Sequence, residues 1–497
     1  MEIMLTIKQN LLVLLLILCS STLIKAQYEI VDAFPNVSFN RPVLMTYSPD
    51  QTNRIFVVEQ AGKILVFPND HDVMPNQVHT FLDITDKFPG GIPPYAEYGL
   101  LGLAFHPDFV QNGTFFIDYV TTQGEIKTHV SKYLVSQSDP NMANDTTETI
   151  LLEVDQPLEN HNAGMLCFGN DGYLYISLGD GGWEYPNGEP DPDSTAQDLR
   201  KLLGSILRID INNSSDSLLY GIPPDNPFAG NSQGYREEIF AYGFRNPWRF
   251  NIDPVSGKIW VGDVGFASWE EIDIAEPGKN YGWSQAEGFD CRPGVNCDIE
   301  LYEPPVYVYA NGLVGCAITG GAVYRGPGRP ELLGKYIYGD WCEGKIWSLE
   351  DNGDSTFTNT LLTDEDISIS SFGMDENYEL YVVALDFNSP TKIYKFQPEP
   401  NFVDQSDRNY KSFSLLQNYP NPFNPITEIE YSISESSKIS LKVFNLLGQL
   451  VALLDEGYKQ AGKYKVAFDG TGLANGVYLY QLAANNFIDT KKLIILK

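Results

Sequence analysis

Short runs of aromatic and β-branched residues recur throughout residues 28–397, separated by turns rich in Gly, Pro, Asn and Asp. Strands are therefore expected, and helical periodicity is almost absent. Several runs share one order, a polar turn and then a strand, and we interpret them as loose internal repeats resembling the inner hairpin of a propeller blade. They are TNRIFVVEQAGKILVF (52–67), NDGYLYISLGD (170–180), SGKIWVGDVG (256–265), GKYIYGDWCEGKIWSL (334–349) and ENYELYVVALDFNSPTKIYKF (376–396).

The length of this repeat region sets the number of blades. About 370 residues, at roughly 60 per blade with ordinary loops, predict an all-β fold with six blades, and five or seven remain alternatives. A β-sandwich needs fewer strands, and an α/β fold needs helices that the pattern lacks. One short helix is expected at STAQDLRKLLG (194–204), with Ser194 or Thr195 as its cap.

The N-terminus and the charge balance indicate an exported protein. Residues 1–26 carry Lys8, the apolar run 11–18 and a small residue at Ala26, which predicts a cleaved signal peptide. Lipidation at Cys19 is the alternative. No later run is long enough for a transmembrane segment. The formal net charge of −32 argues against nucleic acid or an anionic membrane as a partner, because both bind clustered cations.

Five cysteines remain after the signal peptide, and export permits disulfides. Cys291 and Cys297 flank a Pro-Gly turn and are predicted to pair. Cys316 and Cys342 are then the natural second bridge, and Cys167 stays as a buried free thiol in an apolar strand. A metal cluster is the rival interpretation, without a CxxC spacing or nearby histidine to support it.

Composition changes at 398–412, which is polar, contains proline and is predicted to be a linker. Beyond it, residues 413–497 alternate with period two and predict a small immunoglobulin-like antiparallel β-sandwich. This tail resembles the type IX secretion C-terminal sorting domain. The resemblance implies contact with the type IX secretion machinery, passage through the periplasm, and release or attachment at the cell surface. It is carried by LLQNYPNPFNP (415–425), VFNLLGQLV (443–451), LANGVYLYQL (473–482) and KKLIILK (491–497).

The repeat region, with propeller bounds 27–397, resembles the glucose/sorbosone dehydrogenase family. That family consists of six-bladed propellers and includes soluble quinoprotein aldose dehydrogenases and hedgehog-interacting-protein-like proteins. Six motifs in family order carry the resemblance. They are EYGLLGLAFHPDF (97–109), ENHNAGMLCFGNDGYLYISLGDGG (159–182), AQDLRKLLGSILRIDIN (196–212), YGFRNPWRF (242–250), GDVGFASWEEIDIAEPGKNYGW (262–283) and CAITGGAVYRG (316–326).

The resemblance implies oxidation of a small-molecule or glycan-end sugar at its anomeric carbon. Hydride would pass to the quinone cofactor PQQ, made more electrophilic by calcium, and electrons would leave to an external acceptor. His161 matches the family's catalytic base, a role that suits a neutral imidazole. Arg245 and Asn246 match the cofactor-contacting pair, and a loop clamp is their alternative role.

The same resemblance implies the calcium ligands, which are backbone carbonyls of Gly265 and Phe266 with Asp263 as a nearby carboxylate. The stretches 179–182 and 189–193 are an alternative place for a second, structural calcium. Arg325 is expected to replace a family Lys that contacts the cofactor.

Departures from the family pattern favour a second hypothesis. Glu97 stands where the quinoproteins have Gln, and Ile367 and Ile369 stand where they have two arginines. The three carboxylates of PQQ would then lack partners, at a high desolvation cost. Several motifs also favour the hedgehog-interacting-protein-like branch. The alternative to a dehydrogenase is therefore a propeller that binds carbohydrate or protein without catalysis, and a hydrolase is a distant third because no GxSxG occurs.

Overall fold

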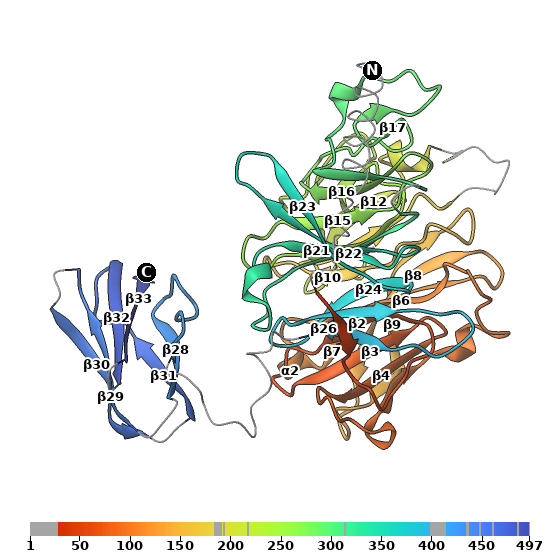
Figure 1. Ribbon diagram of the computed structural model, residues 1–497. Helices are drawn as coiled ribbons and strands as arrows, with labels where there is room; N and C mark the ends of the chain where they lie inside the picture. Colours follow the sequence, from red (N-terminus) through yellow and green to blue (C-terminus); the bar gives the residue numbers. More distant parts are fainter. Residues whose placement is uncertain are drawn as a thin grey trace, which may run out of the picture. The chain divides into compact units, whose positions relative to one another are not determined.

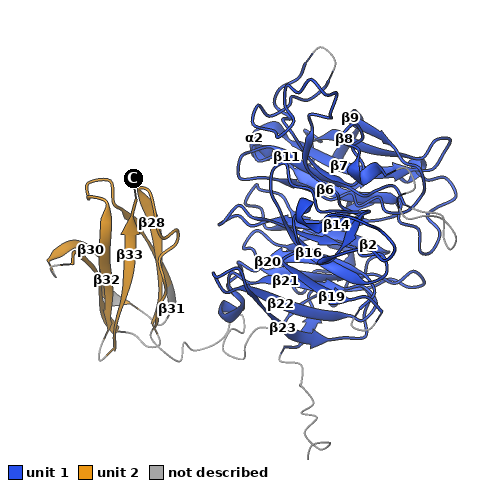
Figure 2. Ribbon diagram, turned by 90° about the horizontal axis from the view of Figure 1, so that it is seen from above, with its two compact units in different colours: residues 1–401 blue, residues 402–497 orange. Residues whose placement is uncertain are grey.

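The computed structural model describes residues 28–182, 191, 194–215, 218–312 and 315–397, and in the tail 414–433, 437–446, 449–459, 462–484 and 487–496. The chain forms two compact units, residues 1–401 and 402–497 (Figure 2). The predicted signal peptide and linker lie outside the described residues, as do all of 189–193 except Asp191.

Six four-stranded antiparallel sheets form the described part of the first unit, so the prediction of a six-bladed propeller is confirmed (Figure 1). The first three are β2 (Pro42–Tyr47) to β5 (His79–Asp83) through β3 (Arg54–Glu59) and β4 (Lys63–Pro68); β6 (Gly99–Phe105), β7 (Thr114–Thr121), β8 (Lys127–Val135) and β9 (Ala143–Asp155); and β10 (Leu166–Phe168), β11 (Leu174–Leu178), β12 (Ser205–Ile209) and β13 (Ile239–Tyr242).

The remaining three sheets complete the ring. They are β14 (Pro247–Ile252), β15 (Ile259–Asp263), β16 (Trp269–Ala275) and β19 (Tyr307–Ala310); β20 (Ile318–Val323), β21 (Tyr336–Asp340), β22 (Lys345–Asp351) and β23 (Phe357–Asp364); and β24 (Ile369–Met374), β25 (Leu380–Ala384), β26 (Ile393–Phe396) and β1 (Ile30–Asp32). A small hairpin, β17 (Ala286–Glu287) and β18 (Asp290–Cys291), is inserted between β16 and β19.

The first strand of each blade lies at the centre of the ring. β2, β6, β10, β14, β20 and β24 contact one another in that order, and β24 contacts β2 again. The ring is closed by β1, which pairs Ile30 with Phe396 of β26. The starts of these inner strands therefore meet at one end of a central channel, and their last residues meet at the other.

The hydrophobic core is divided into layers between neighbouring blades. Six clusters of buried side chains each join two adjacent blades, including the last and the first. A strand in such a layered arrangement is covered on both faces, and β11 is buried at every position. This explains why NDGYLYISLGD reads as a nearly continuous apolar run.

Helix is scarce in the described residues. The single α-helix is α2 (Phe109–Asn112), and the 3-10 turns are η1 (Pro75–Gln77), η2 (Thr85–Lys87), η3 (Thr195–Gln197), η4 (Ile299–Leu301) and η5 (Pro330–Leu332). The predicted helix at 194–204 is wrong, because only η3 forms there. The Asp191 carboxylate accepts hydrogen bonds from the Thr195 and Ala196 amides, and Leu202 and Leu203 are drawn into the core, so tertiary contacts override local propensity.

Both predicted disulfides are present, Cys291–Cys297 and Cys316–Cys342. Cys167 is free, as predicted, but it is only partly buried, because β10 borders the far mouth of the channel. The surrounding apolar side chains raise the pKa of its thiol to about 11.

The second unit has its own core, formed between two sheets. One sheet contains β27 (Ser414–Leu415), β28 (Ile426–Ile433) and β31 (Gly462–Asp469). The other contains β30 (Leu450–Lys459), β29 (Ser437–Phe444), β32 (Gly476–Ala484) and β33 (Phe487–Ile495). β28 and β29 alternate buried and more exposed side chains, as expected for a sandwich with one face packed and one solvated.

Candidate functional site

A cleft of about 330 Å³ opens where the inner strands begin. Val43, Ile318 and Ile369 line it from the starts of β2, β20 and β24. In the described part of its wall, aliphatic side chains alternate with uncharged polar and aromatic groups, and the sole charged side chain is that of Glu97. The polar groups are Gln60, Asn246, Thr319 and Ser370, and the aromatic groups are Tyr95, Trp248, Trp341 and Phe387.

His161 lies beside this cleft, in the loop before β10. Its backbone has a positive φ of 57°, an uncommon conformation for a residue other than glycine. The His161 amide donates to Glu97 Oε2 at 2.7 Å. On the opposite side, Gly179 of the GDGG motif packs so closely that a Cβ there would lie 2.0 Å from the His161 carbonyl oxygen. The glycine therefore permits the loop to hold His161 in place.

The His161 ring lies between the carboxylate of an aspartate and the guanidinium of an arginine. Nδ1 lies 2.7 Å from Asp180 Oδ1, and Nε2 lies 2.9 Å from Arg245 Nη2. Because a guanidinium only donates hydrogen bonds, Nε2 must accept and Nδ1 must carry the proton directed at Asp180. The imidazole is thus fixed as one tautomer, with its basic nitrogen already occupied by Arg245.

Asp180 is nearly fully buried and makes two further contacts. Its Oδ2 accepts from the Trp283 indole at 2.7 Å, and its Oδ1 accepts from the Gly182 amide at 2.8 Å. Burial alone would raise the pKa of this carboxyl, but His161, Arg245 and the Gly182 amide together hold that pKa below its ordinary value. Asp180 therefore remains a carboxylate that orients the imidazole.

Arg245 and Asn246 connect His161 to the next blade. Both of their amides donate to the Asp263 carboxylate, at 2.9 and 2.7 Å. The Asn246 side-chain oxygen accepts from the Ala163 amide, and Arg245 Nη1 donates to the Val264 carbonyl. The backbone clamp expected as one role for this pair is present, and the Arg245 guanidinium also reaches His161.

Three carboxylates surround a small enclosed cavity of about 10 Å³ behind Arg245. They belong to Asp263, Glu271 and Glu287. Desolvation raises the pKa of Asp263 to about 7, and desolvation with the nearby Asp273 and Asp263 charges raises the pKa of Glu271 well above its ordinary value. Glu287 Oε2 is buried and has no hydrogen-bond partner among the described residues.

The predicted calcium loop lies against this cavity. The Phe266 amide and the three amides that follow it all donate to Glu287 Oε1, at 2.8 to 3.3 Å. The Gly265 amide donates to Glu270. A Cβ on Gly265 would lie 1.6 Å from the Trp269 carbonyl oxygen, so the tight loop requires glycine. Asp263, Gly265 and Phe266 are therefore brought together, and Glu271 and Glu287 join them.

Arg325 lies apart from these residues. It follows the far end of β20, and its guanidinium donates to both oxygens of Asp253 at 2.8 and 2.6 Å. Ile369, by contrast, lines the cleft. The sequence indicated Asp180 only as part of a possible calcium loop, and its carboxylate is used here by His161, Trp283 and Gly182. No local motif indicated Glu287, which reaches the site from the inserted hairpin.

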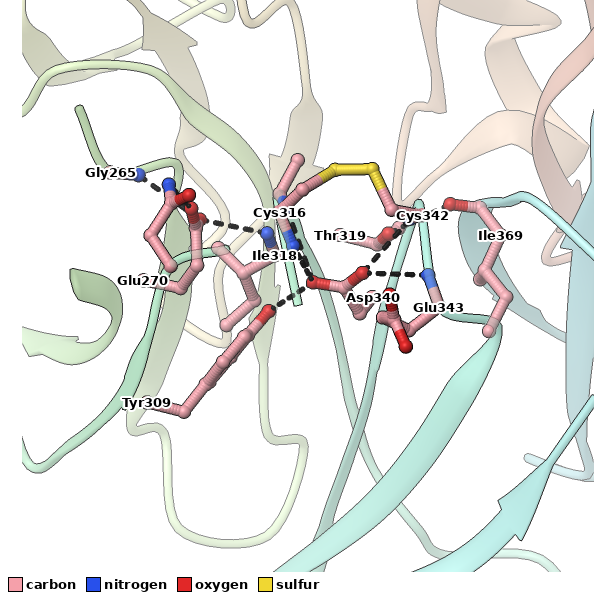
Figure 3. The surroundings of a disulfide bond; sticks show 12 residues. Gly265, Glu270, Tyr309, Cys316, Ile318, Thr319, Asp340, Cys342, Glu343 and Ile369 are labelled. Atoms are coloured by element: carbon pink, nitrogen blue, oxygen red, sulfur yellow. Dashed lines mark hydrogen bonds between the residues drawn. A yellow bond between two sulfur atoms is a disulfide. The ribbon is translucent and has the colours of Figure 1, made fainter. Parts of the chain in front are cut away.

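The Cys316–Cys342 disulfide fixes two loops at the edge of the cleft. Figure 3 shows the Asp340 carboxylate between them: one oxygen accepts from the Tyr309 hydroxyl and the Cys316 amide, and the other accepts from the Cys342 and Glu343 amides. The two sulfurs form the disulfide, and both oxygens of the Asp340 carboxylate accept hydrogen bonds. The disulfide and this carboxylate together hold the two loops and position Trp341, whose amide donates to the Ala317 carbonyl.

Comparison with known proteins places this geometry in a family. The model of glucose/sorbosone dehydrogenases matches residues 39–392. The chain belongs to the glucose/sorbosone dehydrogenase family. It is similar to the HIPL1 protein of Arabidopsis thaliana, with 32% identity over 369 residues, 61% of this chain and 51% of that protein. It thus spans about half the length of that relative.

Two sugar dehydrogenases of this family are also similar to the chain. The aldose sugar dehydrogenase YliI of Escherichia coli is 30% identical over 306 residues, which cover 59% of this chain and 77% of that protein. The PQQ-bound form of the aldose sugar dehydrogenase from Streptomyces coelicolor has a TM-score of 0.56 at 18% identity, covering 75% of this chain and 99% of that one. The latter shows a shared fold.

The tail matches the secretion system C-terminal sorting domain over residues 417–496, as predicted. This match indicates export by the type IX secretion system to the cell surface or beyond it. Within the described residues, no helix is both long and apolar enough to cross a membrane.

Proposed function

We propose that this propeller binds a neutral sugar in its cleft and that it does so without PQQ. The observation that carries the proposal is the charge of the cleft wall. Its described residues include no Lys or Arg, and they include the Glu97 carboxylate. PQQ has three carboxylates, and burying them beside a fourth without cations would cost several kcal/mol per ion, on the order of the desolvation penalty of unpaired charges.

Two nearby cations are already engaged elsewhere. Arg245 donates to His161 and to the Val264 carbonyl. Arg249, at the centre of the channel, donates to the Val43 and Leu101 carbonyls, and burial lowers its pKa to about 9. Arg41 stands behind the cleft wall, with its guanidinium 4.9 Å from the centre of the Phe387 ring, and its Nε and Nη2 have no hydrogen-bond partner among the described residues. One guanidinium behind the wall does not match three carboxylates, so the residues do not fit an anionic quinone.

A neutral sugar matches the same wall. Its hydroxyl groups require polar partners without net charge, and the wall offers the amides of Gln60 and Asn246 and the hydroxyls of Thr319 and Ser370. The two hydroxyls already donate to the Ile369 and Pro42 carbonyls, so they would serve a sugar as acceptors. Its apolar ring face requires an aromatic surface, which Trp248 and Trp341 provide. A concave, largely apolar site with a few placed polar groups is the usual form of a small-molecule site.

Calcium, the second implied cofactor, fits better, because Asp263, Glu271 and Glu287 offer hard oxygen ligands around a small cavity and Glu287 Oε2 has no hydrogen-bond partner among the described residues. Arg245 lines the same cavity, and both Asp263 oxygens already accept backbone amides, so an ion would be held chiefly by Glu271 and Glu287. A divalent cation there would neutralise carboxylates that otherwise repel one another. Since the Glu287 carboxylate gathers the amides of the loop after Gly265, the ion's role would be to stabilise the base of the cleft.

A sugar dehydrogenase is the second candidate, and the observation favouring it is the Asp180–His161–Arg245 chain. In that reaction, His161 Nε2 would take the proton of the anomeric hydroxyl while Asp180 holds the ring. Nε2 would first have to exchange its Arg245 hydrogen bond for the sugar hydroxyl. The cleft would also need to bind an electron acceptor other than PQQ, because the three carboxylates of PQQ would lack cationic partners there.

Equilibrium dialysis and calorimetry on the purified chain distinguish the two candidates. With calcium present, we expect glucose or another neutral aldose to bind, PQQ to stay unbound at micromolar concentration, and an artificial dye to remain oxidised. Glu97→Gln should not restore PQQ uptake, because the missing cations remain missing. Stoichiometric PQQ uptake with dye reduction, lost in His161→Ala, would overturn the proposal in favour of the dehydrogenase.

A further inference from the structure

Three aromatic rings surround the mouth of the cleft, and we call Tyr95, Trp341 and Phe387 the aromatic rim. We propose that the aromatic rim binds the body of a neutral oligosaccharide whose terminal unit occupies the cleft, so that the ligand is a glycan chain and not a free monosaccharide. The inference rests on the proposed function, because it extends the same site outward.

The aromatic rim is assembled from three separate loops. Tyr95 precedes β6, Trp341 lies in the turn between β21 and β22, and Phe387 follows β25. The ring centres of Tyr95 and Phe387 are 4.5 Å apart, and those of Trp341 and Phe387 are 5.7 Å apart. All three side chains also line the cleft. One continuous aromatic surface therefore leads from the cleft to solvent.

Tyr95 is displayed to solvent at a conformational cost. Its side chain is 78% exposed, and its backbone has a positive φ of 64°. A bulky residue avoids that region, and an exposed ring gains little from packing, so folding alone does not account for the arrangement. Pro93 and Pro94 come directly before it and stiffen the loop. A ring kept rigid and uncovered is suited to binding from solution.

Arg41 braces the aromatic rim from behind. Its Nη1 donates to the Ile92 carbonyl at 2.6 Å, which fixes the loop that carries Tyr95. Its guanidinium also lies against the Phe387 ring. One partly buried cation thus contacts two of the three loops.

The chemistry of this surface selects a neutral saccharide chain. The cleft volume of about 330 Å³ is at the small end of ligand sites, so a longer ligand must extend out of it. Aromatic faces pack against the apolar faces of sugar rings, and the wall carries no cation for a sulfated or uronic unit. Glu97 further disfavours an anion.

Calorimetry of the full chain with glucose, maltotetraose, cellotetraose and laminaritetraose tests the inference. We expect at least one tetrasaccharide to bind at least tenfold more tightly than glucose. Tyr95→Ala should abolish that difference, because the variant should weaken tetrasaccharide binding at least fivefold more than it weakens glucose binding. Tyr95→Asn, which tolerates a positive φ, should give the same result and excludes an effect of backbone rearrangement. Phe289→Ala, at an exposed ring outside the cleft wall, is the matched control and should change nothing.

The outcomes separate this inference from the proposed function. If glucose and all tetrasaccharides bind equally, and Tyr95→Ala has no effect, the aromatic rim is not a glycan surface while the sugar cleft stands. If no sugar binds, both ideas fail. Tighter binding of a tetrasaccharide that survives Tyr95→Ala would also contradict the assigned role of the aromatic rim.

Discussion

At the scale of single residues, position was easier to predict than connection. His161 of the motif HNAG lies beside the cleft, and Arg245 and Asn246 of FRNPW lie with it, while their catalytic and cofactor roles stay predictions. The sequence did not reveal the hydrogen bond from Arg245 to Nε2 of His161, because the two residues lie 84 positions apart and belong to different blades. Arg325 shows a different limit. It belongs to the same motif as Ile318, but Ile318 begins β20 and lines the cleft, whereas Arg325 follows the other end of that strand, at the far mouth of the channel.

Replacing Asp180 by Asn should destabilise the chain by about 2–4 kcal/mol at pH 7, because it removes one charge from a buried network. Urea denaturation measures this, with exposed Asp354→Asn as the control. The folded pKa of Asp180 is lowered, so its contribution is present above the unfolded value of about 4 and is lost as pH falls through the folded value. A gap between wild type and variant that does not shrink in acid would refute this.

At the scale of elements, the local sequence predicted the strands well, but the one helix that it predicted, at 194–204, does not form. Strand runs repeat a pattern that every blade satisfies in the same way. The 194–204 segment has helical spacing, but Asp191 and the neighbouring cores fix it as a turn. The inserted hairpin was also unpredicted, although it supplies Glu287, the residue around which the loop after Gly265 folds.

This loop leads to a prediction about calcium. Chelation with EDTA should lower the melting temperature by a few degrees, corresponding to a loss of about 1–3 kcal/mol, and added Ca²⁺ should restore it. Glu287→Gln should remove the response to calcium, since it takes away one ligand charge. Glu376→Gln, at an acidic residue outside this cavity, should respond as the wild type does. An unchanged melting temperature after chelation would contradict a structural calcium.

At the scale of the whole molecule, repetition made the architecture predictable. Chain length and repeat spacing gave six blades, and the composition change at 398–412 anticipated two compact units. The chemical content of the cleft could not be read in the same way, because only β2, β14, β20 and β24 of the inner strands line it, each with one or two side chains, and loops supply the rest. Ile369 was the informative exception, since its departure from the family pattern lies in the cleft wall.

Ring closure makes a prediction at this scale. Deleting residues 28–32 removes β1 and the buried Tyr28, and it should reduce the free energy of unfolding by about 3 kcal/mol through lost apolar burial and strand pairing. Urea denaturation of the shortened chain measures the loss. Glu29→Ala leaves the strand intact and is the control. Equal stability of the shortened chain would show that β1 is dispensable.

The pairing of Ile30 with Phe396 also dictates an order of events during synthesis. The strand β1 is made first, yet its partner β26 is among the last parts of the propeller to be made. The sixth blade, and the core layers on both its sides, must therefore wait until nearly the entire first unit is available. The ring can close only once Phe396 has been made, shortly before the chain of the second unit begins.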